Sequence, residues 1–118
     1  MKKILTAFYF LILSSTALAA DLSPECSARI KHHRTSIEAA AKATYYYQSL
    51  CAVDDIKPAD CGITEKDLSN ADLISLAVRK VSYSKKPLTE IEAQTLLQIC
   101  KLNNFDTDTI GKIIEEMP

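Results

Sequence analysis

Four cysteines are the residues whose spacing says most about the chemistry of this chain: Cys26, Cys51, Cys61 and Cys100. The gaps between them are 25, 10 and 39 residues. A structural zinc site normally uses closely spaced ligands such as C-x₂-C, so this spacing favours disulfides over a metal. An even number of cysteines in a short exported chain predicts two disulfide bonds. We therefore expect no metal and no cofactor.

Other residue types that support catalysis form weak patterns. His32 and His33 are adjacent, and adjacent helical residues point about 100° apart, so their rings do not easily share one metal. Carboxylate pairs at 54–55 and 115–116 lie in polar sequence, whereas an acid–base pair needs an apolar cleft that separates its two pKa values. No Gly-x-Ser-x-Gly nucleophile motif is present. We expect a partly buried His33, a solvent-facing His32 and no enzymatic activity; a pH-responsive histidine pair is the alternative.

Tyrosines and basic residues are the candidates for a surface that binds another protein. Tyr45, Tyr46 and Tyr47 are consecutive, so on a helix they spread over about 200° and at most two can join the core. We expect Tyr47 in the core and at least one tyrosine at the surface, where tyrosine is enriched in protein interfaces. The predicted partner surface consists of Arg79, Lys80, Lys85, Lys86, Tyr45 and Tyr46.

Charged residues are unevenly distributed, and this asymmetry suggests how a partner is attracted. Arg29, Lys31 and Arg34 are expected to join the basic residues between 79 and 86 in one basic pole. The loops at the other end are acidic, with Asp54, Asp55, Asp60, Glu65, Asp67, Asp106 and Asp108. Such a dipolar surface steers an oppositely charged partner. The alternative is an ordinary solvated surface.

The first 19 residues have the pattern of a secretory signal peptide. Lys2 and Lys3 precede an apolar run from Ile4 to Leu13, and small residues at 17–19 suit a cleavage site. The apolar run is about ten residues long, whereas a membrane span needs roughly 17–25. We expect cleavage after Ala19 or Ala20, no membrane anchor, and a periplasmic or secreted mature protein of bacterial origin.

The mature part, residues 20–118, has the size of one domain. Cleavage removes Lys2 and Lys3, so the number of basic residues falls from 14 to 12, against 15 acidic residues. Nucleic-acid binders are normally strongly basic, so we expect no nucleic-acid partner. No small-molecule substrate is evident, and an unidentified protein is the expected partner.

The composition predicts an all-α fold, because there are only two glycines and no Asn-Gly or Asp-Gly hairpin turn. Ser23 and Pro24 form a good helix start. A capping box at residues 35–38 interrupts the segment that follows, so residues 24–52 form one helix or two helices with a break near 35. Residues four and three apart place one stripe of this segment inward: Cys26, Ile30, His33, Ile37, Ala40, Thr44, Tyr47 and Cys51.

The second half predicts three more helices. Residues 52–62 are expected to form a loop, and a capping box at 64–67 then begins a helix to about Ser82, unless Asn70 restarts it. A second capping box at 89–92, with Leu88 stapled against Ala93, begins a helix to about Leu102. Asp106 or Thr107 caps the last helix. The inward residues are Leu68, Ala71, Ile74, Val78 and Val81, then Ile110, Ile113, Ile114 and Met117.

Helix direction restricts the disulfide pairing. In an antiparallel bundle Cys51, Cys61 and Cys100 share one end, and a straight first helix puts Cys26 about 37 Å away from Cys51. A disulfide needs a Cα separation of about 4.4–6.8 Å, so the first segment would have to fold back. We prefer Cys51–Cys61 with Cys26–Cys100; the alternative is Cys51–Cys100 with Cys26–Cys61. A straight helix would leave Cys26 for an intermolecular bond.

The chain resembles two kinds of small helical periplasmic protein. Cys51 and Cys100 are spaced much like the two cysteines of acid-stress chaperones of the HdeA/HdeB type, and residues 88–114 have a similar helix–Cys–Asn-turn–helix order. This resemblance covers about half of the mature chain, and Cys26 and Cys61 depart from it. A second likeness, to periplasmic immunity proteins against cell-wall-degrading toxins, rests on size, export and helicity.

These observations predict a small bundle of four or five antiparallel helices stapled by two disulfides. The expected function is protein–protein binding of the inhibitor, immunity or accessory-factor type. The alternative, implied by the first resemblance, is an acid-stress chaperone whose bundle loosens as carboxylates and histidines protonate. An enzyme is the minor alternative.

Overall fold

The computed structural model describes residues 22–55 and 58–118, and every regular element in this part of the chain is a helix, as predicted. The predicted signal peptide and its cleavage site lie outside the described residues. Five helices have nine residues or more, and α4 is a single turn. The helices are α2 (Pro24–His32), α3 (Arg34–Val53), α4 (Pro58–Cys61), α5 (Glu65–Tyr83), α6 (Glu90–Cys100) and α7 (Thr107–Glu116).

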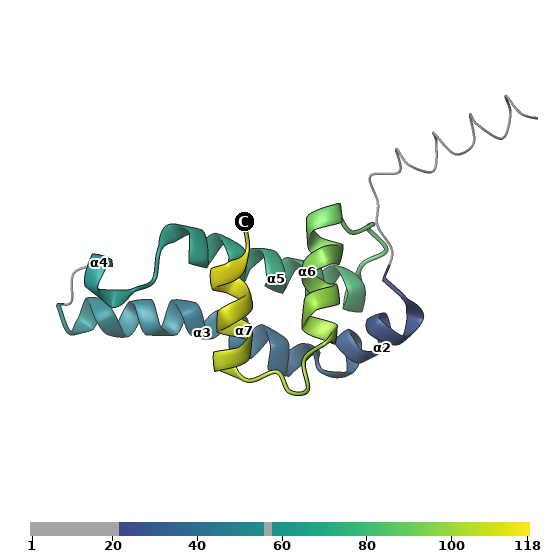
Figure 1. Cartoon of the computed structure of the whole chain (residues 1–118), viewed down its shortest axis with the longest axis horizontal. Helices are drawn as coiled ribbons and strands as arrows, with labels where there is room; N and C mark the ends of the chain where they lie inside the picture. The colour runs from purple at the N-terminus through teal and green to yellow at the C-terminus, as the bar shows by residue number, and fades with distance from the viewer. Residues whose placement is uncertain (1–21, 56–57) are drawn as a thin grey trace, which may run out of the picture.

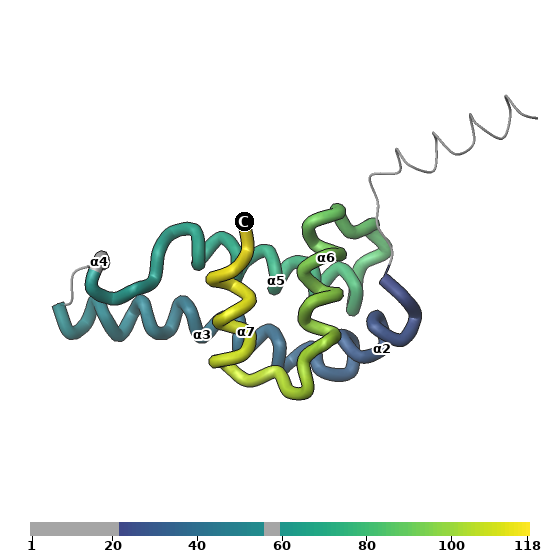
Figure 2. Tube along the Cα trace, viewed as in Figure 1, coloured from purple at the N-terminus to yellow at the C-terminus, as the bar shows by residue number. Residues whose placement is uncertain are grey.

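The helices form two antiparallel pairs that cross each other (Figure 1). α3 and α5 run side by side in opposite directions, and α6 and α7 lie across them, again in opposite directions (Figure 2). α2 packs against α5 and α6 at the beginning of α3. The predicted small antiparallel bundle is therefore confirmed.

The first helical segment breaks at His33, close to the predicted position but for a different reason. His33 separates α2 from α3 with φ −103° and ψ 16°, and its side chain makes no capping hydrogen bond. Thr35 lies inside α3, so the predicted capping box at 35–38 is wrong. Glu38 does not reach back to Thr35; it accepts hydrogen bonds from Arg34 at 2.9 Å and from Arg79 at 2.8 Å.

The two later capping boxes are confirmed. Thr64 accepts from the Asp67 backbone N–H at 3.2 Å, and the Asp67 carboxylate accepts from the Thr64 N–H at 2.9 Å. Thr89 and Glu92 make the same exchange at 3.2 and 2.7 Å. Asp106 caps α7 by accepting from the Thr109 N–H at 2.8 Å.

Two predicted boundaries differ from the structure, and one alternative that the sequence left open does not occur. Residues 52–62 are not only a loop, because α3 continues to Val53 and α4 begins at Pro58. α6 ends at Cys100 instead of Leu102. Asn70 does not restart α5; it is buried in the helix and donates a hydrogen bond to the Ile114 carbonyl at 2.9 Å, which ties α5 to α7.

The hydrophobic core lies where the two pairs cross. On α3 the inward stripe is buried only as far as Ala40 and Ala41; beyond them Thr44 and Cys51 are half-buried and Tyr47 is exposed. Its last turns therefore extend past the crossing helices (Figure 1). The largest fully buried side chains are Ile30, Ile37, Ile74, Val78, Leu96, Ile99, Ile110 and Ile114.

The disulfides are Cys26–Cys100 and Cys51–Cys61, which is the preferred pairing, with Cα separations of 5.8 and 5.9 Å. The expectation that Cys51, Cys61 and Cys100 share one end of the bundle is nevertheless wrong. α6 crosses the α3–α5 pair instead of returning along it, so the end of α6 lies near α2 and far from the end of α3 (Figure 1). Cys100 ends α6 and is bonded to Cys26 of α2, whereas Cys51 lies in the last turn of α3. The two disulfides therefore staple opposite ends of the molecule, and α2 does not fold back to the Cys51 end.

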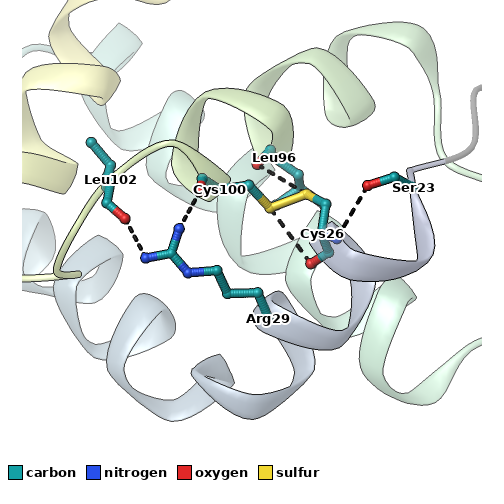
Figure 3. The surroundings of a disulfide bond; sticks show 6 residues. All are labelled: Ser23, Cys26, Arg29, Leu96, Cys100 and Leu102. Carbon is teal, nitrogen blue, oxygen red and sulfur yellow. Dashed lines mark hydrogen bonds between the residues drawn. A yellow bond between two sulfur atoms is a disulfide. The ribbon is translucent and has the colours of Figure 1, made fainter.

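The Cys26–Cys100 disulfide belongs to a cluster that fixes α2 to the end of α6 (Figure 3). Ser23 caps α2 by accepting from the Cys26 backbone N–H at 3.2 Å. The Arg29 guanidinium donates to the carbonyls of Cys100 and Leu102. Because α6 has ended there, these carbonyls lack helical partners, and a cation at a helix C-terminus also interacts favourably with the helix dipole.

Candidate functional site

An exposed apolar surface covers the end of α3 that extends past the core. We call Tyr46, Tyr47, Leu50 and Val53 the arm surface; their exposed fractions are 62, 49, 42 and 81%. Tyr46, Leu50 and Val53 are four and three residues apart, so they share one side of the helix, and the rings of Tyr46 and Tyr47 lie 6.0 Å apart. Clustered exposed apolar side chains of this kind mark interaction sites more often than isolated ones do.

A covalent clamp holds the arm surface in place. The Cys51–Cys61 disulfide joins the end of α3 to α4. Gly62, with φ 79°, ends α4 in the left-handed region that glycine adopts without strain, and the chain then enters α5. The end of α3 is therefore anchored to the chain on one side while its apolar residues stay in solvent.

Four carboxylates lie in the segments that follow the arm surface in the chain, and we call them its acidic rim. Asp54 and Asp55 follow directly on α3, Asp60 lies on α4, and Glu65 begins α5; all four are exposed. Four of the seven residues of the predicted acidic pole thus lie near the exposed tyrosines in the chain. An apolar patch with an acidic rim suits a partner that has a basic rim.

A groove of about 480 Å³ adjoins the arm surface. It lies between α3, the start of α5 and α7, and Tyr47 belongs to both the arm surface and the groove wall. Ile63 lines the same groove, and α7 contributes Asp108, Gly111 and Glu115. The arm surface and the groove therefore form one continuous region.

A second, smaller groove brings together two of the predicted partner residues. Tyr45 and Arg79 line it with Lys42, Asp72 and Leu76, between α3 and α5, in a volume of about 430 Å³. A hydrogen bond to the Asp72 carboxylate raises the pKa of Tyr45, and burial and the negative charge of Asp72 act in the same direction. The hydroxyl of Tyr45 is thus engaged within the chain.

The predicted basic residues are divided between the fold and the surface. Arg79 pairs with Glu38 and Lys80 pairs with Glu92, each at 2.8 Å. These ion pairs join α5 to α3 and to α6, so both residues have a structural role. Lys85 and Lys86 are exposed in the segment that follows α5, at the opposite end of the α3–α5 pair from the last turns of α3 (Figure 1). The structure therefore does not bring the six predicted partner residues into one surface.

The histidines lie as expected. His32 is exposed and His33 is half-buried, with its ring centroid 4.7 Å from that of His32 and 4.9 Å from that of Phe105. The Arg29 guanidinium lies over the Phe105 ring, 4.9 Å from the ring centroid. Within residues 22–55 and 58–118, no group of three or more His, Cys, Asp or Glu residues is arranged to hold a metal ion.

Sequence reasoning missed Leu50 and Val53 and placed Tyr47 in the core. The helical periodicity was predicted correctly, since Tyr47 is on the same stripe as Ile37 and Ala40. The other helices cover this stripe at Ile37 and Ala40 but leave Tyr47 exposed. The available signal was the run of apolar residues outside the stripe, Leu50 and Val53, close to a short disulfide loop. Apolar residues on both sides of a helix end indicate that part of it serves another surface.

Comparisons with protein-family models, curated proteins and solved structures find no significant match to this chain. The cysteines that carry the resemblance to acid-stress chaperones, Cys51 and Cys100, are bonded to different partners in the structure. Among the described residues, no helix combines the length and the apolar composition needed to cross a bilayer.

Proposed function

We propose that this chain is an exported binding protein that docks another protein through the arm surface. The observation that carries this proposal is the exposure of four apolar residues, two of them tyrosines, on a helix end that a disulfide fixes. Tyrosine supplies a large contact area at low entropic cost and is enriched in interfaces. Pre-organisation by the disulfide reduces the entropy lost on binding.

Two intramolecular disulfides support export to an oxidising compartment, of which the periplasm fits the bacterial type of leader. In that location a small rigid scaffold suits an inhibitor, an immunity protein or an accessory factor. Each of these acts by occupying a partner's surface, and none needs a catalytic cleft. The proposal is therefore of a binding protein, not an enzyme.

A pair of double variants tests this proposal. Tyr46→Ser with Val53→Ser removes the two most exposed arm residues, whereas Ile91→Ser with Leu97→Ser removes two α6 residues that are 40 and 42% exposed. In affinity capture from the native periplasm, the arm variant should lose the stoichiometric partner that the wild type retains. The α6 variant should keep it. Equal retention by both variants, with unchanged helical circular dichroism, contradicts the role of the arm surface.

A second function, an acid-responsive chaperone, is favoured by one observation. Glu38 and Glu92 are 7 and 3% exposed, and each accepts hydrogen bonds from a cation on α5. Protonation of these carboxylates would remove ion pairs that hold α5 to α3 and to α6, and apolar core surface would become exposed. Binding of an apolar dye between about pH 2 and 7 tests this. A fold that stays closed to the dye throughout eliminates the chaperone.

A further inference from the structure

Gly111 occupies an unusual position in α7. Gly111 lies in the interior of α7, where glycine stabilises a helix less than alanine does. Apart from its two chain neighbours and the adjacent backbone of α7, no heavy atom lies within 4 Å of the place that a Cβ at Gly111 would occupy, and the φ of Gly111 is not in the left-handed region. Neither a close contact nor the backbone conformation in the described structure requires a glycine here.

Gly111 faces the groove beside the arm surface. Asp108, Gly111 and Glu115 are three and four residues apart, so they lie along one face of α7, and all three line the groove. With no side chain at position 111, the backbone of α7 is open to a ligand between the two carboxylates. Glycine serves elsewhere in proteins where another chain must approach a backbone closely.

The charges and the ring that line the groove identify the chemistry of its ligand. The groove lining is acidic, because it contains three carboxylates and one basic residue, Lys112. The carboxylates are those of Asp67, Asp108 and Glu115. Tyr47 and Ile63 supply an aromatic and an aliphatic contact on the side that meets the arm surface. Arginine and lysine side chains bind carboxylates and pack on tyrosine rings, and their aliphatic stems contact apolar residues.

We propose that this groove binds an extended basic segment of the partner protein, which packs against α7 at Gly111 and places arginine or lysine beside Asp108 and Glu115. This rests on the proposed function and specifies the partner's chemistry. Tyr47 is the point at which the basic segment would meet the apolar contact on the arm surface. The acidic rim of the arm surface reinforces the same selection.

Two dye-labelled peptides, one of alternating arginine and leucine and one of alternating glutamate and leucine, serve as probes of the oxidised chain in fluorescence anisotropy. The basic peptide should bind, and the acidic peptide should not. Glu115→Lys should lower the affinity for the basic peptide by about tenfold, because it removes a pairing charge from the groove. Glu116→Lys makes the same charge change one residue away, outside the groove lining, and should weaken it by less than about twofold.

Equal weakening by Glu115→Lys and Glu116→Lys would show that the peptide binds only through net charge, and that result overturns the proposal. So does the absence of binding by the basic peptide.

Gly111→Ala gives a test in which folding and binding move in opposite directions. Alanine should raise the midpoint of thermal unfolding, because it favours the helix and its methyl group meets no atom beyond the adjacent residues of α7. The same variant should lower the affinity for the basic peptide by about tenfold, since the methyl group occupies the space where the peptide packs against α7. A stabilised variant with unchanged affinity refutes the role of Gly111, and so does a destabilised one.

The two proposals fail in different ways. If the arm variants lose the native partner while Glu115→Lys and Gly111→Ala retain it and leave peptide binding unchanged, docking through the arm surface stands and the groove inference falls. If the arm variants retain the partner, the proposed function itself falls.

Discussion

Glu92 shows how one buried side chain links helix capping to tertiary structure. Burial of the carboxylate raises its pKa, but hydrogen bonds from Lys80 and from Thr89 outweigh this and hold the pKa of Glu92 below its ordinary value of 4.5. The same oxygen accepts from Lys80 on α5 and from the Thr89 N–H that begins α6. One carboxylate thus caps the start of α6 and attaches this helix to α5.

Glu92→Gln should lower the free energy of unfolding by about 1–3 kcal/mol at neutral pH, because it replaces charged hydrogen bonds with neutral ones. Since the pKa of Glu92 is lowered by folding, its stabilisation is complete above the unfolded pKa and disappears as the pH falls through the lower folded pKa. The difference between variant and wild type should therefore shrink when the pH is lowered from neutral to an acidic value well below 4.5. Urea unfolding at both pH values measures it.

Glu90→Gln is the matched control, because Glu90 is exposed in the same first turn of α6. Its effect should stay within about 0.5 kcal/mol at both pH values. A Glu92→Gln effect that is as small as this, or that grows in acid, contradicts the role assigned to the carboxylate.

Among the elements, the two disulfides have different tasks. Cys26–Cys100 closes a separation of 74 residues and ties the core together, whereas Cys51–Cys61 closes a separation of 10 residues at the end of α3. By loop-closure entropy, the first stabilises by about 4.4 kcal/mol and the second by about 2.7 kcal/mol. The first therefore stabilises mainly the fold, and the second also fixes the arm surface.

Replacing each cysteine pair by serine separates these tasks. Urea unfolding should show a larger loss for Cys26→Ser with Cys100→Ser than for Cys51→Ser with Cys61→Ser. Hydrogen exchange should become faster at residues 47–53 in the second variant, while the core helices keep their protection. The opposite order of stability loss, or exchange that rises equally everywhere, is inconsistent with this assignment.

Local sequence predicted the elements better than their arrangement. The boxes at Thr64 and Thr89 and the cap at Asp106 were recognised because each uses side chains within three residues of the helix start. The crossing of α6 over α5 was not predicted, since it depends on how the side-chain ridges of helices far apart in the sequence pack together. For the same reason the stripe through Tyr47 gave the correct face of α3 without showing where its covering helices end.

For the whole molecule, the division between core and arm is the feature that relates structure to function. Most of the isoleucines are buried where the crossed pairs meet, whereas the end of α3 extends past this core (Figure 1). The exposed apolar residues of this end adjoin the groove through Tyr47. The basic residues at the other end are partly used in ion pairs within the fold. We propose that this single acidic and apolar end is where the protein docks its partner.

Site-specific photo-crosslinking in the native host tests that claim most directly. A photoreactive benzoylphenylalanine is placed at position 53 on the arm surface or, as the control, at position 97 on α6, both of which are exposed in the wild type. Irradiation should give one discrete heavier product from position 53 and none from position 97. The same product from both positions, or no product from position 53, would contradict it.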